Sequence, residues 1–164
     1  YDGLPTAKKL EMLSMEKGLP TGLHKFINAM KQSYTVDLVH INCAPRFFHE
    51  YALSRLRAEG YRLAVASNSI RYSVQLMMEK SNLLEYLDFF LSNQDVKRAK
   101  PDPEIYSTAI QRLNLAPNEV LVVEDNRNGI QAATAAGANV MKVETVYDVN
   151  YENIMAHIKG AEEE

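Results

Sequence analysis

Val120-Leu121-Val122-Val123-Glu124-Asp125 is a run of four aliphatic residues that ends abruptly in two acids. A continuous apolar run of this length is typical of a strand that is buried on both faces of a parallel sheet. Leu63-Ala64-Val65-Ala66 has the same character and ends in Ser67-Asn68. Two such strands, each followed at once by polar residues, predict a parallel sheet whose chemistry lies at the carboxyl ends of its strands.

The segments around these strands alternate between helix and strand patterns. From Pro45 onward, apolar residues that recur at steps of three and four are separated by short apolar runs. This alternation predicts an α/β fold, a Rossmann-like parallel sheet with helices on both faces. The expected helices cover about 45–60, 71–80, 102–113, 129–137 and 154–158, and the expected strands cover 63–66, 89–91, 120–123 and 140–143.

The first part of the chain has helical periodicity and no strand pattern. Pro5 fits the first turn of one helix, and Gly18 is placed to end it. Pro45 disfavours helix at the residue before it, so we expect a boundary near Cys43. Two units follow, a helical unit over 1–43 and the α/β unit over 44–164. The second helix of the first unit has an apolar stripe made by Leu23, Phe26, Ile27, Met30, Tyr34, Leu38 and Ile41.

Composition excludes several classes of protein. The 164 residues are 46% hydrophobic and 24% charged, with a net charge of −3, which is typical of a folded globular chain. The sequence has no cluster of Lys and Arg residues of the kind that binds nucleic acid, and no apolar run approaches the roughly 18–20 residues that span a membrane. Cys43 is the single cysteine and cannot form an internal disulfide. We therefore expect a cytoplasmic protein that binds neither nucleic acid nor membrane.

Three polar features fall where successive strands end. They are Ser67-Asn68, Lys100 and Glu124-Asp125. A hydroxyl and a lysine suit a phosphate group, and two carboxylates suit Mg²⁺. Each feature alone has an ordinary alternative, since Ser-Asn makes turns, a lysine before Pro-Asp-Pro is often solvated, and Asp caps helices. Their coincidence at three strand ends favours a site that holds a phosphate and a divalent metal.

These residues belong to longer motifs that resemble a known family. The motifs are Val65–Ser69, Ala99–Tyr106 and Val122–Ile130, and they resemble the second, third and fourth motifs of the haloacid dehalogenase superfamily in sequence, order and spacing. The resemblance is closest to the branch with a helical cap, which includes β-phosphoglucomutase and many sugar-phosphate phosphatases. It covers roughly residues 1 to 143, so the first unit corresponds to a partial cap.

The resemblance implies a role for each candidate residue. Ser67 and Lys100 are implied to be catalytic and to bind the phosphoryl group, with Asn68 beside them. Asp125 is implied to coordinate Mg²⁺, with Glu124 helping directly or through water. Lys31 matches a cap lysine that reaches the substrate in mutase-like relatives, although a solvated lysine on a helix is an equal alternative.

Two departures from the family pattern matter. Asn126 stands where relatives often have serine, which leaves the contribution of this side chain open. More seriously, the sequence contains no Asp-x-Asp-Gly motif at the end of an apolar strand. We interpret Asp2 as a loop residue, because no strand pattern precedes it. The chain therefore lacks the family's nucleophile and first strand, and we expect it to be inactive and poorly stable alone.

The resemblance therefore implies a Mg²⁺-dependent phosphohydrolase for a small phosphomonoester such as a sugar phosphate, which acts through an aspartyl-phosphate whose nucleophile is absent from this chain. A β-phosphoglucomutase-like phosphomutase remains an alternative, as does a non-catalytic phosphate-binding domain if the native chain starts at Tyr1. A phospho-acceptor receiver domain uses similar residues, but there the acids come first along the chain. Substrate identity and oligomeric state stay open.

Overall fold

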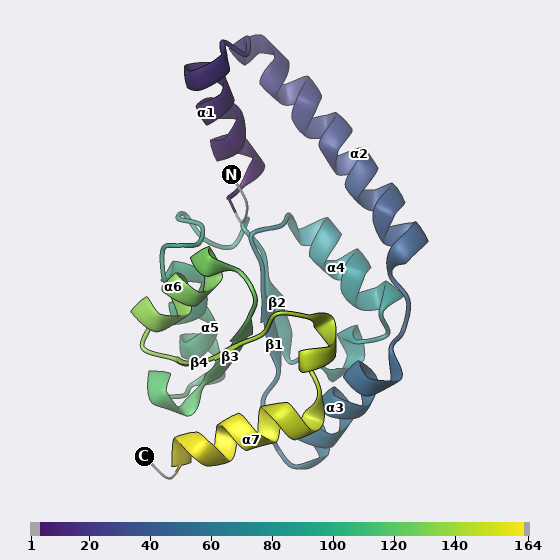
Figure 1. Cartoon of the computed structure of the whole chain (residues 1–164), viewed down its shortest axis with the longest axis vertical. Coiled ribbons are helices and arrows are strands. Elements are labelled where there is room, and N and C mark those ends of the chain that lie inside the picture. Colours follow the sequence, from purple (N-terminus) through teal and green to yellow (C-terminus); the bar gives the residue numbers. More distant parts are fainter. Residues whose placement is uncertain (1–3, 163–164) are drawn as a thin grey trace.

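Four short parallel strands form two separate pairs in the computed structural model, which describes residues 4–162 (Figure 1). Strand β1 (Ala64–Ala66) pairs with β2 (Phe89–Leu91), and β3 (Leu121–Glu124) pairs with β4 (Asn139–Lys142). Each lies within a residue or two of its predicted position. Asp2, which the sequence analysis interprets as a loop residue, lies outside the described residues.

Helices surround the strands in the predicted alternation. The described helices are α1 (Thr6–Lys17), α2 (His24–Asn42), α3 (Phe47–Ala58), α4 (Arg71–Lys80), α5 (Glu104–Leu113), α6 (Arg127–Ala135) and α7 (Tyr151–Glu162). Short 3₁₀ turns cover Thr21–Leu23, Leu84–Tyr86, Pro117–Glu119 and Val146–Asp148. None of the helices described here combines the length and the apolarity that a membrane span needs.

Helices cover both faces of the strands, although the single parallel sheet that the sequence predicted is present as two separate pairs. Residues of α5 and α6, including Ile105 and Ala132, pack with Val122 of β3 in one apolar cluster. The neighbouring residues of β3, Leu121 and Val123, lie against a second cluster that joins α3, β4 and α7. Alternate residues of a strand point to opposite faces, so the two clusters lie on opposite sides of β3.

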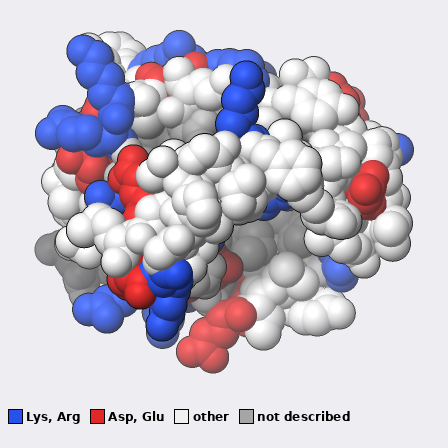
Figure 2. Space-filling view, turned by 90° about the horizontal axis from the view of Figure 1, so that it is seen from above, with Lys and Arg blue, Asp and Glu red and all other residues white. Residues whose placement is uncertain are grey.

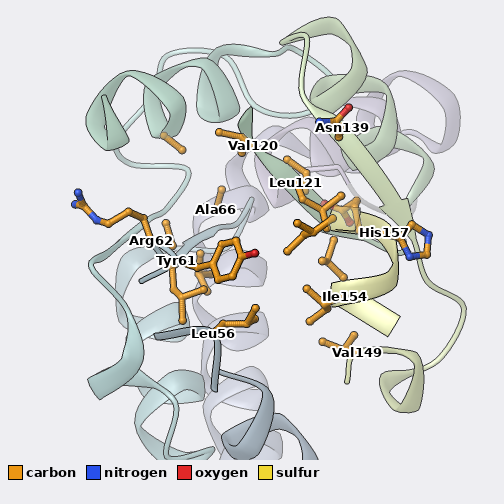
Figure 3. A pocket seen from close by; sticks show the side chains of 18 of the residues that line it. Leu56, Tyr61, Arg62, Ala66, Val120, Leu121, Asn139, Val149, Ile154 and His157 are labelled. Atoms are coloured by element: carbon orange, nitrogen blue, oxygen red, sulfur yellow. The ribbon is translucent and has the colours of Figure 1, made fainter. Parts of the chain in front are cut away.

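The prediction that β3 is buried on both sides is wrong in part. Val122 is buried, but Leu121 and Val123 are only partly buried. The reason is a groove of about 900 Å³ between β1 and β3, onto which both residues open (Figure 3). The groove lining is dominated by apolar residues of the two strands and of α3, α5 and α7.

The strand edges that face this groove pair with no other strand among the described residues. On β1, the Leu63 carbonyl and the Ser67 N–H bond to β2, at 2.7 and 3.0 Å. On β3, the carbonyls of Val120 and Glu124 accept from the β4 side. Backbone groups of a strand point alternately to its two neighbours, so the intervening residues of β1 and β3 direct theirs into the groove. The groove therefore has the two edges that one further parallel strand needs.

Helices α1 and α2 form a hairpin at one end of the molecule (Figure 1). Leu10 of α1 and Val39 of α2 are buried, but most of the apolar stripe of α2 is exposed. Phe26 is 62% exposed and Ile41 is 77% exposed. Seen from this end, a broad uncharged band crosses the surface (Figure 2). The stripe forms as the sequence predicts, but nothing among the described residues covers it.

Candidate active site

Lys100 is the centre of a buried polar cluster between the two strand pairs. Its ammonium group donates to Glu124 Oε2 at 2.8 Å, to the Tyr106 hydroxyl at 2.7 Å and to the Ala66 carbonyl at 3.0 Å. These bonds use all three donors of the ammonium group. Lys100 is therefore held at the carboxyl end of β1, and it is not the solvated loop lysine of the alternative interpretation.

The loop that carries Lys100 is fixed from two sides. The Asn68 amide binds the backbone of Lys100, accepting from its N–H at 3.1 Å and donating to its carbonyl at 3.3 Å. At the start of α5, the Glu104 carboxylate accepts from the N–H groups of Lys97 and Arg98. The structure thus gives Asn68 a positioning role that the sequence did not predict, since sequence reasoning placed it only beside the phosphoryl group.

Glu124 is held as firmly as Lys100. Its Oε2 also accepts from the Tyr106 hydroxyl at 2.6 Å, and its Oε1 accepts from the Asn126 N–H at 3.2 Å. Burial disfavours the charged carboxylate, but the hydrogen bonds from Lys100 and Tyr106 outweigh burial and lower the pKa of Glu124. The site therefore contains a charged pair rather than a neutral acid.

Gly129 in α6 leaves the space that the Glu124 side chain occupies. A Cβ at this position would lie 2.1 Å from the Glu124 carboxyl carbon, far inside contact distance. Because Lys100 and Tyr106 hold that carboxylate, it cannot move aside without loss of those bonds. The glycine in the fourth sequence motif is therefore required by the packing of the acid that precedes it.

Tyr106 is a site residue that sequence reasoning missed. It lies among the buried residues of α5. Its hydroxyl reaches Glu124 and Lys100, and burial together with the neighbouring carboxylate raises the pKa of this hydroxyl. The signal available in the sequence is that Tyr, rather than Phe, stands in the first turn of the helix that follows Lys100.

Asp125 has the properties of a metal ligand. It is exposed at the groove between β1 and β3, next to Glu124, and no ion pair or hydrogen bond of its carboxylate is found among the described residues. Mg²⁺ commonly takes one or two carboxylates and fills its remaining positions with water and phosphate oxygens. Asp125 fits this role directly, whereas Glu124 already uses both oxygens and fits a role through water. No group of three or more potential ligands lies among residues 4–162.

Asn126 caps helix α6. Its side-chain oxygen accepts from the Asn128 N–H at 2.9 Å, and α6 begins at Arg127, two residues before the predicted start. The capping bond satisfies an N–H group that the first turn of a helix otherwise leaves without a partner. An asparagine does this as well as the serine that the family pattern favours.

A second, smaller pocket contains the remaining predicted residues. Ser67 and Asn68 line it from the end of β1, and Lys31 lines it from α2. The Ser67 hydroxyl accepts from the Ser69 N–H at 3.1 Å. This bond forms the turn that is the ordinary alternative role of a Ser-Asn pair after a strand. The hydroxyl hydrogen stays free to donate, so the turn and phosphate binding are compatible. The structure thus brings Lys31 to the pocket that Ser67 lines.

Comparisons with known proteins identify relatives of this chain. The family profile described as haloacid dehalogenase-like hydrolase matches residues 3–143. The phosphorylated carbohydrates phosphatase of Thermotoga maritima is 34% identical over 150 residues, which cover 90% of this chain and 65% of that protein. A haloacid dehalogenase-like hydrolase domain-containing protein of Arabidopsis thaliana is 39% identical over 111 residues, or 63% of this chain and 34% of that protein. The chain thus spans between about a third and two thirds of these curated relatives.

Solved structures show the same fold. β-Phosphoglucomutase from Clostridium difficile has a TM-score of 0.80 at 17% identity, covering 99% of this chain and 80% of that chain. CbbY from Rhodobacter sphaeroides, solved in complex with phosphate, has a TM-score of 0.74 at 23% identity, covering 87% of this chain and 66% of that chain. Because the family profile spans most of its length, this chain belongs to the haloacid dehalogenase-like hydrolase family.

Proposed function

We propose that this chain provides the phosphate-binding and metal-binding parts of a Mg²⁺-dependent phosphohydrolase for small phosphorylated metabolites. The observation that carries the proposal is that the buried Lys100 joins the carboxyl ends of β1 and β3, because it bonds to the Ala66 carbonyl next to Ser67 and to Glu124 next to Asp125. Ser67, Lys100 and Asp125 are of the residue types that bind a phosphoryl group and a divalent cation.

Each residue has a distinct part in the proposal. The Ser67 hydroxyl donates to a phosphoryl oxygen. The Lys100 ammonium neutralises charge on the phosphoryl group, while Glu124 and Tyr106 hold it in place. Asp125 ligates Mg²⁺, which supplies charge neutralisation for the transferring phosphoryl group when bound. Asn68 fixes the loop that carries Lys100.

The nucleophile is the missing part of this arrangement. None of these residues can form the covalent aspartyl-phosphate that the family resemblance implies. We propose that a further parallel strand, absent from the 164 residues, fills the groove between β1 and β3 and carries this aspartate at its carboxyl end. Three features support it: the groove lining is mostly apolar, its two strand edges pair with no strand among the described residues, and Glu124 and Asp125 line it. On this account residues 1–43 are the later part of a cap and residues 44–164 are a core that lacks its first strand.

The substrate class rests on the relatives. The Thermotoga maritima relative is a phosphatase of phosphorylated carbohydrates, and a phosphoglycolate phosphatase of Nitrosospira multiformis is 35% identical over 96 residues, or 58% of this chain and 42% of that protein. Both names describe small phosphomonoesters, which favours the same class here. A second candidate, a phosphomutase acting within a sugar phosphate, is favoured by Lys31, because this cap residue lies in the pocket that Ser67 lines.

The test is phosphate release by the protein purified from its source, with Mg²⁺ and a panel of sugar phosphates and phosphoglycolate. We expect turnover that requires Mg²⁺ and falls by about a thousandfold or more in Lys100→Met and Asp125→Asn variants. The 164-residue chain is expected to give no turnover. Isomerisation of a sugar phosphate that needs a bisphosphate activator would favour the mutase. Turnover that is independent of Lys100 would contradict both candidates.

A further inference from the structure

All three donors of the Lys100 ammonium group bond to protein acceptors in the candidate site. These acceptors are Glu124 Oε2 at 2.8 Å, the Tyr106 hydroxyl at 2.7 Å and the Ala66 carbonyl at 3.0 Å. An ammonium group on a lysine has no fourth N–H. A phosphoryl oxygen that bonds to Lys100, as the proposed function requires, must therefore take the place of one of these three acceptors.

The bond to Glu124 is the most costly of the three to give up. It joins opposite charges on side chains that are only 9% and 11% exposed. Exchange of this bond would leave the Glu124 carboxylate buried without its cation, which is strongly unfavourable. We therefore expect this ion pair to remain when a phosphoryl group binds.

The Ala66 carbonyl depends on Lys100 for its donor. Leu63 and Ser67 direct their backbone groups to β2, so the carbonyl of Ala66 points to the other side of β1. The donor that it meets there is Lys100, at the carboxyl end of the strand. Exchange of this bond would take that donor from a partly buried backbone group, which also costs free energy.

The Tyr106 hydroxyl keeps a hydrogen bond if Lys100 ceases to donate to it. Its own proton goes to Glu124 Oε2 at 2.6 Å, and this bond does not involve Lys100. The Lys100 ammonium also lies 4.5 Å from the centre of the Tyr106 ring, a contact that attracts the cation independently of the hydroxyl. Of the three acceptors, the Tyr106 hydroxyl is therefore the one that gives way at the lowest cost.

We propose that Tyr106 is a positioning residue whose hydroxyl holds the third donor of Lys100 until a phosphoryl oxygen takes its place. The inference rests on the proposed function and deepens it, because it names the bond that is exchanged when the phosphoryl group binds. After the exchange, Tyr106 still donates to Glu124 and so keeps the carboxylate in place. A hydroxyl can do both because it accepts and donates.

The exchange predicts effects of opposite sign on stability and on phosphate binding. In Tyr106→Phe, one N–H of the buried Lys100 loses its acceptor, so the folded chain becomes less stable. Part of that cost is recovered when a phosphate oxygen supplies the acceptor, so phosphate binding becomes tighter. A tyrosine that only packed against Lys100 would give the reverse, since its loss would loosen the lysine and weaken phosphate binding.

The test is titration calorimetry of inorganic phosphate with the full chain in the presence of Mg²⁺. We expect Tyr106→Phe to bind phosphate about fivefold more tightly than the unaltered chain. Tyr72→Phe is the matched control, because Tyr72 is exposed on α4 and lines neither the groove nor the small pocket. We expect this control to stay within about 1.5-fold of the unaltered chain. Circular dichroism checks that each variant folds.

Fluorine NMR follows the exchange in a chain that keeps the hydroxyl, so it serves even if Tyr106→Phe fails to fold. A single 3-fluorotyrosine at position 106 reports changes in the hydrogen bonds of its own phenol through the chemical shift of the ring fluorine. We expect this signal to move when phosphate is added, because Lys100 ceases to donate to the phenol. A 3-fluorotyrosine at position 72 is expected to keep its chemical shift.

The outcomes distinguish this inference from the proposed function. Equal or weaker phosphate binding by a folded Tyr106→Phe overturns the role of Tyr106 and leaves the phosphohydrolase proposal standing. A fluorine signal at position 106 that does not move at saturating phosphate does the same. If the unaltered chain binds no phosphate, the phosphohydrolase proposal fails, and the exchange at Tyr106 fails with it.

Discussion

Helices α2 and α5 have the same kind of apolar spacing and opposite surroundings. In α5, Ile105 is fully buried in the cluster that includes β3 and α6, and Ile110 is almost fully buried as well. In α2, Phe26 and Leu38 occupy equivalent positions of a stripe and are about 60% exposed. Helical periodicity shows which face of a helix is apolar. It does not show whether the surface that covers this face belongs to the same 164 residues.

The same contrast occurs on the two sides of the candidate site. On one side, the side chains of Lys100, Tyr106 and Glu124 are hydrogen-bonded to one another and to neighbouring backbone groups. On the other side, the edges of β1 and β3 face an open apolar groove. The first region is complete within the chain. The second is an open apolar surface that no described residue covers. The following predictions test this difference.

Loss of Lys100 is expected to have the largest effect on stability. Lys100→Met leaves the buried Glu124 carboxylate without its cation, which costs about 3–5 kcal/mol of unfolding free energy. Lys97 is an exposed lysine of the same loop, and Lys97→Met is expected to change the free energy of unfolding by less than about 0.5 kcal/mol. Urea unfolding followed by circular dichroism measures both. Equal effects would show that the cluster is not a stabilising unit.

Truncation of the two helix faces sharpens the comparison. Ile110→Ala in α5 removes buried contacts and is expected to cost about 3 kcal/mol. Leu38→Ala in α2 removes a side chain that is 59% exposed and is expected to cost less than about 0.5 kcal/mol. The same urea titration measures both. A large loss with Leu38→Ala would mean that the α2 stripe is covered in solution.

Gly129→Ala tests the packing of Glu124 on α6. The added methyl group collides with the held carboxylate, and we expect a loss of about 2 kcal/mol. Gly160→Ala is the matched helical control, because its Cβ would meet open space, and helix propensity predicts a gain of about 0.5–1 kcal/mol. Thermal melts of the two variants should move in opposite directions. If both rise, Glu124 has room to move.

A smaller effect concerns Asp88, which joins the starts of β1 and β2. Burial disfavours its charge, but bonds from the Leu63 N–H, Arg57 and Arg62 lower the pKa of its carboxyl below the usual 3.8. A carboxyl whose pKa is lowered by folding stabilises above that usual value, and the contribution is lost as pH falls below about 4.

Asp88→Asn should therefore reduce stability by about 1 kcal/mol at neutral pH and by much less near pH 3. Melting temperatures of the variant and the unaltered chain across this pH range measure the difference. Asp37 is exposed on α2, so Asp37→Asn serves as the control. The melting temperature of this variant should differ from that of the unaltered chain by the same small amount at every pH. A gap that stays constant down to pH 3 would contradict the assignment to Asp88.

The sequence predicted the order of helices and strands well, for a physical reason. Apolar runs and the polar residues that end them are local patterns, and parallel strands bring their carboxyl ends together. The hydrogen bonds of the Tyr106 hydroxyl, and those of the Asn68 amide to the backbone of Lys100, join residues that are far apart in the sequence. No local sequence pattern contains such contacts. The exposure of the α2 stripe could not be read from spacing alone.

The central claim is that the groove between β1 and β3 takes a strand that carries the nucleophile. The most direct measurement is the intact mass of the native protein from its source, with its N-terminal peptides sequenced. The account predicts a further apolar stretch that ends in Asp-x-Asp-Gly and precedes the cap helices. A native protein that starts at Tyr1 would contradict the claim, and Ser67, Lys100 and Asp125 would then form at most a phosphate-binding site without catalysis.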